Sequence, residues 1–383
     1  MRRISILGAT GSIGGSTLDL VRRNRADWQV AALTAQTNVA DLAALAREFS
    51  AEMAVIGDEA QLPALREVLA GSGVTAAGGP AALIEAAQCP ADLVVAAIVG
   101  CAGLAPTMAA IERGAAVALA NKEALVSAGS VMTAAVARHG ATLLPMDSEH
   151  NAIFQCLAGN ELSDVRSITL TASGGPLREW SAAQLDAASP AEAVAHPNWS
   201  MGAKISVDSA TMFNKGLELI EAHHLFPIPL DALKIVVHPQ SVIHSLVEYR
   251  DGSSLAQLGP SDMRVPIASC LAWPARMETP MAPLDLAALG QLTFFAPDEV
   301  RFPATRLARE AAEAGGAAPA VLNAANEIAV GAFLAGQIKF TRIAPLVSET
   351  LASLDLARPV TLDDVFAVDQ AARARAAHLL ERC

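Results

Sequence analysis

The stretch Ile4-Ser5-Ile6-Leu7-Gly8-Ala9-Thr10-Gly11-Ser12-Ile13-Gly14 decides the fold of this chain. Residues 4–7 have the composition of a buried strand, and a helical pattern begins directly after the glycines. Glycines let the backbone approach a pyrophosphate closely, and the first turn of a helix offers free N–H groups to that anion. The stretch therefore predicts a strand–turn–helix unit that binds a dinucleotide, with the less common spacing GxxGxxG.

Short β-rich runs alternate with helical patterns over residues 1–147. We expect strands at residues 4–7, 30–33, 53–56, 93–99, 117–120 and 142–145, with helices between them, for example at 39–49 and 62–69. The run 93–111 is uncharged like a membrane span, but Gly100, Gly103 and Pro106 interrupt it, which favours a buried strand, a turn and a helix start. The alternation predicts a parallel sheet covered by helices on both faces.

From Asn151 the pattern changes. Strand-like runs at 168–171, 235–237, 242–249 and 254–258 lie among long polar loops, prolines recur between Pro274 and Pro303, and the remaining sequence is helical. Thr361 and Asp364 form the pattern of a capping box that opens the last helix. We predict an α/β protein with a Rossmann-like parallel-sheet domain (1–147), an α+β catalytic and dimerisation domain (148–275, with a lid loop near 173–203), a Pro-rich linker (276–300) and a C-terminal helical bundle domain (301–383).

Composition narrows the class of protein. Of 383 residues, 52% are hydrophobic and 17% charged, which is typical of a globular protein rather than a disordered one. The formal net charge of −12 argues against a nucleic-acid partner. Five cysteines without a CxxC pair, and an N-terminal apolar run too short for a signal peptide, favour a reduced, cytoplasmic protein with no membrane partner.

The end of the second expected strand bears on the choice of cofactor. NAD enzymes usually place Asp or Glu there to hold the ribose hydroxyls. This chain has Gln36-Thr37-Asn38 instead, without an acid. An uncharged strand end tolerates a 2′-phosphate but supplies no cation for it, so the sequence favours NADP weakly.

Two acidic residues follow the expected strand 142–145. In extended chain, residues two apart point to the same side, so Asp147 and Glu149 can aim their carboxylates at one point. Two neighbouring carboxylates repel each other and attract a hard cation such as Mg²⁺ or Mn²⁺. The alternative is a solvated acidic turn, which is common on protein surfaces.

The segment Ser206–Glu218 adds a second polar cluster. Asn214, Lys215 and Glu218 share one helical face, and Ser209 is expected just before that helix. A serine, an amide and an ammonium near a helix start suit a phosphate group, and Glu218 could supply a third carboxylate to the metal. The alternative is an amphipathic helix with an exposed Lys215–Glu218 pair of little energetic value.

Two further motifs bracket a long loop. Ser173-Gly174-Gly175-Pro176 precedes it, and His196-Pro197-Asn198-Trp199 follows near its end. Long loops that carry an aromatic side chain are typical of active-site lids, and Trp199 could cover a bound ligand. The alternative is that His196 and Trp199 are ordinary packing residues.

Taken together, these motifs resemble one family. ILGATGSIG, ANKEALV, MDSEHNAIFQ, TASGGPLRE, HPNWSMGAKISVDSATMFNKGLELIEA, HPQSVIHSLVEY and LGPSDMRVPIA are similar to those of the 1-deoxy-D-xylulose 5-phosphate reductoisomerases. The resemblance implies a homodimeric enzyme of the non-mevalonate isoprenoid route. In that family Mg²⁺, Mn²⁺ or Co²⁺ chelates two substrate oxygens, and the substrate rearranges to a branched aldehyde. NADPH reduces this aldehyde to 2-C-methyl-D-erythritol 4-phosphate.

The resemblance also implies roles for individual residues. The expected metal ligands are Asp147, Glu149 and Glu218, and Lys122 and His196 join them as catalytic residues. The expected substrate-binding residues are Lys122, Ser148, Glu149, Ser173, His196, Trp199, Ser209, Asn214, Lys215 and Glu218. The expected NADPH-binding residues are Gly8, Thr10, Gly11, Ser12, Ile13, Gly14, Gln36, Thr37, Asn38, Asn121, Glu123 and Gly202.

One departure from the family pattern concerns the cofactor. Family members often carry Gly-Lys-Asn where this chain has Gln36-Thr37-Asn38. The lysine that would attract the 2′-phosphate is missing, so we expect NADPH to be preferred over NADH by a smaller margin.

Two alternative functions stay open. A simple NADP-dependent aldehyde or alcohol dehydrogenase without isomerisation would not need three carboxylates, and a non-catalytic dinucleotide sensor would not need the lysines beside them.

Overall fold

The computed structural model describes residues 1–199 and 201–381. The chain divides into two compact units, and neither is one continuous segment. Unit 1 contains residues 1–124, 132–151 and 263–280, and unit 2 contains residues 125–131, 152–262 and 281 onward. None of the described helices is long and apolar enough to cross a membrane.

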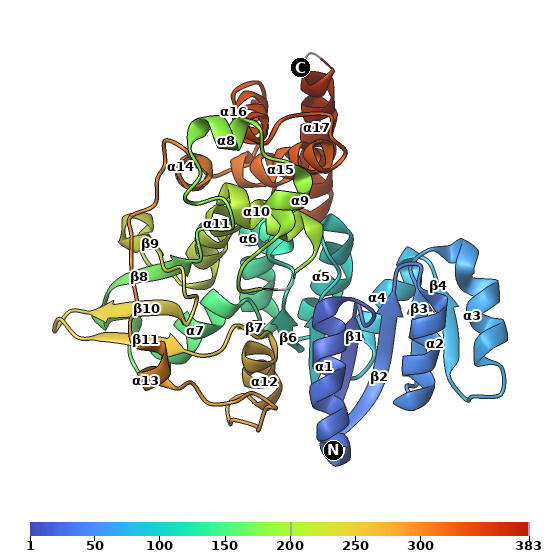
Figure 1. Ribbon diagram of the computed structural model, residues 1–383. Coiled ribbons are helices and arrows are strands. Elements are labelled where there is room, and N and C mark those ends of the chain that lie inside the picture. Colours follow the sequence, from blue (N-terminus) through green and yellow to red (C-terminus); the bar gives the residue numbers. More distant parts are fainter. Residues whose placement is uncertain (200, 382–383) are drawn as a thin grey trace. The chain divides into compact units, whose positions relative to one another are not determined.

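Unit 1 is built on a seven-stranded parallel sheet with the order β4-β3-β2-β1-β5-β6-β7 (Figure 1). The order reverses its direction at β1, which places the turn after β1 at a ligand-binding position of open α/β sheets. Its strands are β1 Arg2–Leu7, β2 Trp28–Ala35, β3 Met53–Ile56, β4 Thr75–Gly78, β5 Leu93–Ala96, β6 Ala116–Leu119 and β7 Thr142–Pro145.

The predicted strands of unit 1 are confirmed with two differences. Strand β5 ends at Ala96 rather than at residue 99, because the chain turns there toward Gly100, which has a positive φ of 69°. Strand β4 was not predicted. Its sequence Thr-Ala-Ala-Gly is made of small side chains, and it lies at the edge of the sheet, so it carries neither the apolar nor the β-branched signal of a central strand.

Helices alternate with these strands as the sequence predicts. Helix α6 has non-helical backbone angles at Ala128, and it begins in unit 1 before its middle passes into unit 2. The helices that lie wholly or partly in unit 1 are α1 Ser12–Arg23, α2 Val39–Glu48, α3 Leu62–Leu69, α4 Pro80–Gln88, α5 Leu104–Glu112, α6 Lys122–His139, α7 Ser148–Leu157 and α12 Arg264–Ala272.

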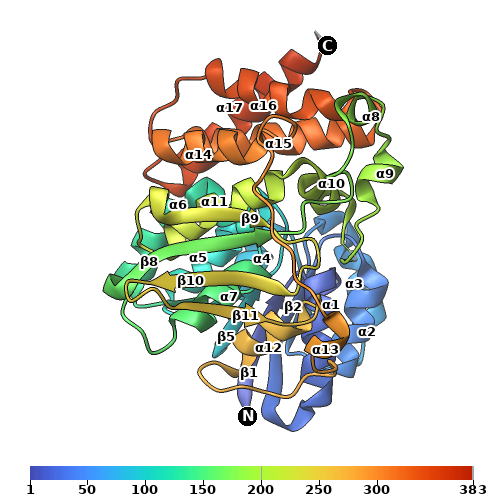
Figure 2. The same ribbon diagram turned by 60° about the vertical axis from the view of Figure 1, so that its left-hand side comes forward.

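Unit 2 contains a four-stranded mixed sheet with the order β11-β10-β8-β9 (Figure 2). Strand β10 runs antiparallel to both β8 and β11, and β9 runs parallel to β8. The strands are β8 Val165–Ala172, β9 Leu233–Val237, β10 Ile243–Tyr249 and β11 Ser254–Leu258. All four coincide with predicted strands, and the predicted α+β character is confirmed.

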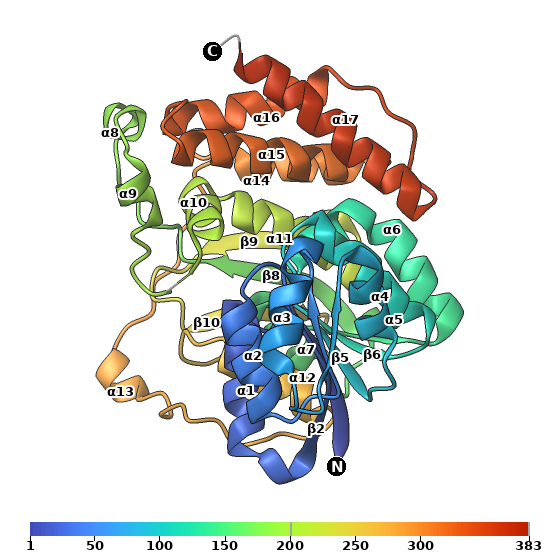
Figure 3. The same ribbon diagram turned by 90° about the vertical axis from the view of Figure 1, so that its right-hand side faces the viewer.

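The remaining helices of unit 2 include the C-terminal group α14 to α17, whose members pack on one another (Figure 3). The predicted capping box opens α17, where Thr361 and Asp364 exchange hydrogen bonds. The helices are α8 Ala182–Asp186, α9 Pro190–Val194, α10 Ala203–Thr211, α11 Phe213–Leu225, α13 Leu286–Leu289, α14 Ala304–Ala314, α15 Ala318–Leu334, α16 Ile343–Ala352 and α17 Leu362–Leu380. The predicted fold class, with its C-terminal helical domain, is confirmed.

Helix α11 crosses α14 at very close range through Gly216. A Cβ atom at Gly216 would lie 2.8 Å from the Cβ of Ala308 and 3.0 Å from the carbonyl oxygen of Ala304. Gly331 in α15 has no heavy atom within 4 Å of the same position. The two glycines therefore differ in their surroundings although both lie inside helices.

We expect Gly216→Ala to destabilise the protein and Gly331→Ala to leave it unchanged or stabilise it. The first substitution forces α11 and α14 apart, at a cost of about 1–3 kcal/mol. The second only improves helix propensity, by up to about 1 kcal/mol. Urea unfolding followed by far-UV circular dichroism measures both changes, and a shift of the same sign in the two variants would contradict the close-crossing interpretation.

Candidate active site

The glycine-rich turn after β1 is shaped by close backbone contacts. Gly8 has a φ of 91°, and a Cβ atom there would lie 2.6 Å from the carbonyl oxygen of Ala97. The turn is held to β2, because Thr34 accepts hydrogen bonds from the N–H of Gly8 (2.9 Å, to Oγ1) and of Ala9 (2.7 Å, to the carbonyl). Helix α1 begins at Ser12 after Gly11, which has no side chain to cap it. The turn thus leaves the helix start open to an anionic ligand.

The segment after β2 holds an acid that the sequence analysis did not include. Asn38 caps α2 by accepting a hydrogen bond from the N–H of Asp41 (3.1 Å). Its amide nitrogen donates to the carboxylate of Asp41 at 2.6 Å. The side chain expected to contact the nucleotide is therefore held by a negative charge. Its signal in the sequence is the three-residue spacing of an Asn and an Asp at a helix start.

Asn121 and Lys122 follow β6 and open helix α6. Asn121 is buried, accepts a hydrogen bond from the N–H of Ala124 (3.1 Å) and donates to the carbonyl of Gly100 (2.8 Å). A Cβ atom at Gly103 would clash with this amide at 2.6 Å. The Gly100–Gly103 turn thus fixes the side chain of Asn121. The glycines in the sequence do not by themselves predict this contact.

The carboxylates of Asp147 and Glu149 are arranged differently from the prediction. The chain is not extended there: Asp147 follows β7, whereas Glu149 lies in the first turn of α7 and donates its N–H to Asp147 (3.1 Å). Both residues still follow strand β7. The helix that starts at Ser148 brings the backbone of Glu149 close to the carboxylate of Asp147. Ser148 donates a hydrogen bond to the carboxylate of Glu149.

Lys122 lies against this acidic pair within unit 1. Its ammonium is 2.8 Å from the carboxylate of Asp147, and the residue is only 6% exposed. Asp147 also lies 3.2 Å from Nδ1 of His150, which is fully buried. A buried ammonium beside a carboxylate is costly unless the geometry is good. The solvated acidic turn is therefore not what the structure has at this position.

In unit 2, the residues of α11 are more buried than an exposed ion pair would be. Lys215 is 3% exposed and Glu218 1% exposed. Lys215 forms an ion pair with Glu218, and Asn214 donates a hydrogen bond to the other carboxylate oxygen. The alternative of an exposed Lys215–Glu218 pair is therefore wrong, because both side chains are almost completely shielded from solvent.

The prediction that Ser209 lies just before helix α11 is wrong. It belongs to the preceding helix α10, and Met212, with a left-handed φ of 68°, joins α10 to α11. The turn is tied by Thr211, whose hydroxyl accepts the N–H of Phe213 (3.4 Å). The sequence Ala-Thr-Met-Phe contains neither Gly nor Pro to mark this break, so the end of one helix and the start of another were not predicted here.

His196 and Trp199 are organised together with Ser173. Nδ1 of His196 accepts hydrogen bonds from the N–H groups of Asn198 (3.2 Å) and Trp199 (3.0 Å). The proton of the neutral ring must then sit on Nε2, which lies 2.8 Å from Oγ of Ser173. Burial lowers the pKa of His196. The ring is thus a neutral donor that points at Ser173.

The indole of Trp199 is anchored from the other side. Its Nε1 donates to Oγ of Ser241 (3.0 Å), and its ring meets that of His244 edge-on with centroids 6.0 Å apart. Ser241 was not among the expected site residues, although the motif HPQSVIH contains it.

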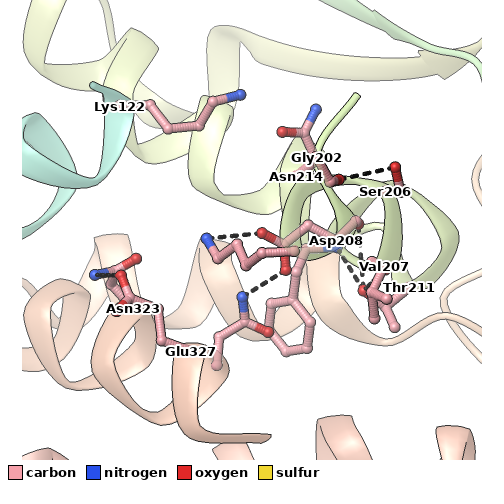
Figure 4. Close-up of polar contacts among 12 residues, drawn as sticks. Lys122, Gly202, Ser206, Val207, Asp208, Thr211, Asn214, Asn323 and Glu327 are labelled. Carbon is pink, nitrogen blue, oxygen red and sulfur yellow. Dashed lines mark hydrogen bonds and ion pairs between the residues drawn. The ribbon is translucent and has the colours of Figure 1, made fainter. Parts of the chain in front are cut away.

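Gly202 comes just before α10, and its carbonyl accepts a hydrogen bond of 3.0 Å from the hydroxyl of Ser206 (Figure 4).

The residues present fit the two groups that the sequence resemblance implies. In unit 1, the open helix start and the tight glycine turn suit a pyrophosphate. Asp147, Glu149 and Glu218 offer only oxygen ligands, and no cysteine is among the residues expected to bind the metal, which suits a hard ion such as Mg²⁺ or Mn²⁺ rather than zinc. Together the parallel sheet, the glycine turn and the three largely shielded carboxylates define a dinucleotide-dependent enzyme.

Comparison with known proteins identifies the family. The family model described as 1-deoxy-D-xylulose 5-phosphate reductoisomerase matches residues 4–129, and two models of its C-terminal domains match residues 143–226 and 258–375. The 1-deoxy-D-xylulose 5-phosphate reductoisomerase of Zymomonas mobilis is 60% identical over 99% of this chain and 98% of its own length. That of Ralstonia nicotianae is 56% identical over the same shares. The chain belongs to the 1-deoxy-D-xylulose 5-phosphate reductoisomerase family, as predicted.

Solved structures agree over the full chain. The Zymomonas mobilis reductoisomerase in complex with NADPH has a TM-score of 0.95 and 58% identity, with complete coverage of both chains. A reductoisomerase in complex with NADPH, fosmidomycin and magnesium has a TM-score of 0.94 and 45% identity, covering 100% of this chain and 98% of its own. These relatives support the reductoisomerase interpretation, and none of this supports the simple dehydrogenase.

We expect acid to loosen the turn that carries Trp199. A released loop protonates His196 near its ordinary pKa of about 6.5, whereas the buried ring binds the proton only at lower pH. The packed, neutral ring therefore contributes its full share to the stability of the turn above about pH 6.5, and this stability is lost as the pH falls below that value. Protonated Nδ1 can no longer accept the N–H groups of Asn198 and Trp199.

Tryptophan emission, measured from about pH 8 to about pH 5, checks this. Subtracting the emission of Trp199→Phe isolates the signal of Trp199, and His196→Asn serves as the control without a titrating ring. A Trp199 signal that is flat through this range, or equally pH-dependent in His196→Asn, would contradict the role of His196.

Proposed function

We propose that this chain converts 1-deoxy-D-xylulose 5-phosphate into 2-C-methyl-D-erythritol 4-phosphate, using NADPH and a divalent metal ion. The observation that carries the proposal is the burial of Lys215 and Glu218 on one face of α11. A buried ammonium and a buried carboxylate cost free energy that an apolar pair would avoid. That cost is understandable where a phosphate and a metal ion are to be bound.

Unit 1 supplies the nucleotide site. The pyrophosphate would lie on the turn formed by Gly8, Thr10, Gly11, Ser12, Ile13 and Gly14, and the adenosine ribose beside Gln36, Thr37 and Asn38. Asn121 and Glu123, together with Gly202 of unit 2, are the remaining proposed contacts. The NADPH bound by the Zymomonas mobilis relative supports this assignment.

Three carboxylates are proposed to hold the metal: Asp147 and Glu149 of unit 1, and Glu218 of unit 2. The bound ion supplies a positive charge that stabilises oxygens becoming negative during rearrangement and reduction. Lys122 holds the carboxylate of Asp147 in place through their 2.8 Å contact. Ser148 orients Glu149 in the same way.

The substrate phosphate is proposed to bind in unit 2. Ser173, Ser209, Asn214 and Lys215 provide hydroxyl, amide and ammonium donors, and His196 adds an Nε2–H. Binding the phosphate away from the reacting carbons lets its binding energy orient those carbons. Trp199 would then cover the ligand and exclude water from the aldehyde.

The wider setting of the enzyme is also part of the proposal. The family resemblance favours a homodimer in the cytoplasm that acts in non-mevalonate isoprenoid synthesis, with a domain division at residues 147, 275 and 300. Fosmidomycin, which a related reductoisomerase binds together with NADPH and magnesium, gives a practical probe of ligand binding by this chain.

The direct test mixes purified protein, 1-deoxy-D-xylulose 5-phosphate, Mn²⁺ or Mg²⁺, and NADPH, and follows the loss of reduced-nicotinamide absorbance. Chelation of the metal should stop the reaction, and the product should be identified by mass and NMR. Turnover of a preformed aldehyde without metal, and no turnover of the ketose phosphate, would favour a simple dehydrogenase. Nucleotide binding without any turnover would favour a sensor.

Glu218→Gln should lower metal-dependent kcat by roughly 100-fold or more while the fold and NADPH affinity survive. The amide keeps the size of the side chain but loses the charge that the ion needs. Steady-state kinetics across a range of Mn²⁺ concentrations measures the effect, and Glu248→Gln, a replacement at a partly exposed carboxylate on β10, is the control. An unchanged kcat would remove Glu218 from the metal site.

Coenzyme preference should depend on Asp41. NADPH is expected to bind more tightly than NADH, but Asp41 places a negative charge beside the proposed 2′-phosphate position and occupies the amide of Asn38. Asp41→Asn should raise the ratio of the NADH Kd to the NADPH Kd by roughly three- to tenfold, the effect of one nearby charge at a protein surface.

Fluorescence titration of the reduced nicotinamide measures these Kd values without turnover. Asp58→Asn is the matched control, because Asp58 is also an acid at a helix start that follows a strand of the same sheet. Equal ratios in the wild type and Asp41→Asn would exclude Asp41 as a selectivity residue. A wild-type preference for NADH would contradict the expected NADPH preference.

A further inference from the structure

Asp208 is a buried acid outside the expected site. It lies in α10, is 1% exposed, and each of its carboxylate oxygens has a separate partner. Oδ2 is 2.8 Å from the ammonium of Lys204 in the same helix. Oδ1 accepts a hydrogen bond of 2.7 Å from the amide of Asn326 in α15, 118 residues away in the sequence. Figure 4 shows Asp208 between its own helix and the C-terminal helices.

Helix α15 presents a polar stripe on an otherwise apolar surface. Asn323, Asn326 and Glu327 lie at i, i+3 and i+4, so they share one face. Both asparagines are fully buried, and their amide oxygens have no hydrogen-bond partner among residues 1–199 and 201–381. Buried oxygens without partners are costly. The stripe therefore calls for a reason other than stability.

The two asparagines make different contacts. The amide of Asn323 donates to Glu327 (3.2 Å) and to Ser127 (3.4 Å), whereas that of Asn326 reaches Asp208. Asn323 thus stays beside the C-terminal helices and α6. Asn326 alone of this pair reaches the helix that carries Ser209.

Asp208 is well placed to fix the proposed phosphate donors. Ser209 is the next residue, and the hydroxyl of Thr211 receives the N–H of Phe213 while donating to the carbonyl of Val207 at 2.9 Å. The end of α10 therefore sets the start of α11, where Asn214 and Lys215 lie. A shift of Asp208 would therefore move Ser209 in α10 and also Asn214 and Lys215 in α11.

The two partners of Asp208 differ in rigidity. Lys204 is partly exposed and lies two residues after Gly202, at the end of the proposed lid. Asn326 is fully buried in α15, where close packing restricts the movement of its side chain. Lys204 neutralises the carboxylate, and Asn326 holds it in place.

We propose that Asn326 is a positioning residue for phosphate binding: through Asp208 it fixes α10 so that Ser209, Asn214 and Lys215 can converge on the phosphate. This inference rests on the proposed function of the site. All the residues involved belong to unit 2, so the nucleotide turn of unit 1 should be unaffected when the pair is broken.

The test uses substitutions that preserve side-chain shape. Asn326→Asp sets two carboxylates against each other, Asp208→Asn removes the acceptor charge, and the double exchange restores one amide and one carboxylate in reversed order. Asn323→Asp is the matched control, since it creates a buried acid one helical turn away that faces Glu327 rather than Asp208. The readouts are the inhibition constant of inorganic phosphate against the ketose phosphate, the Kd of NADPH, and the thermal midpoint.

Asn326→Asp should raise the inhibition constant of phosphate about tenfold, with the Kd of NADPH unchanged, and the double exchange should recover most of this loss. Asn323→Asp should lower the thermal midpoint similarly but keep the phosphate constant near its original value. Equal phosphate constants in both variants and the wild type would overturn the inference and make Asn326 a purely structural residue. Absence of turnover in the unmodified protein is a separate result, which would overturn the proposed function instead.

Discussion

The pairing of Lys215 with Glu218 inside α11 is the interaction on which the site in unit 2 depends. Both side chains are charges in the core, and each stabilises the other there. A ligand that carries negative charge to the lysine must therefore arrive with positive charge for the glutamate. The pair makes joint binding of an anion and a cation favourable over binding of either alone, and this matches a phosphorylated substrate that is used with a metal ion.

Much of the fold could be predicted because its signals are local. The glycine turn, the alternation of strands and helices in residues 1–147, and the capping box at Thr361 each follow from short-range chemistry, and the structure has them. Strand β4 could not be predicted, because an edge strand of Thr, Ala and Gly has no hydrophobic period. The break at Met212 was not predicted either, because a left-handed backbone at a non-glycine residue has no local signal in the sequence.

The chemistry of the candidate site was also largely visible in the sequence, although its geometry was not. Residue types suggested that Asp147 and Glu149 act together, yet the pairing in unit 1 arises from a helix start rather than from extended chain. Burial excluded an exposed ion pair at Lys215, and burial depends on segments far away in the sequence. Asp41, Ser241 and Asp208 were missed because their importance lies in a contact with another side chain, which spacing alone does not reveal.

Helix α6 is shared by the two compact units, unlike a helix in a protein whose domains are consecutive segments of the chain. It starts with Lys122 in unit 1, contributes Val126 to the main apolar core of unit 2, and ends again in unit 1. Residues 263–280 likewise return to the first unit between two long segments of the second, residues 152–262 and the chain from residue 281 onward. Neither unit can be produced from one uninterrupted stretch of the gene, so a fragment that ends at any single cut lacks part of a core, and the two halves must acquire their structure from the same, nearly complete polypeptide.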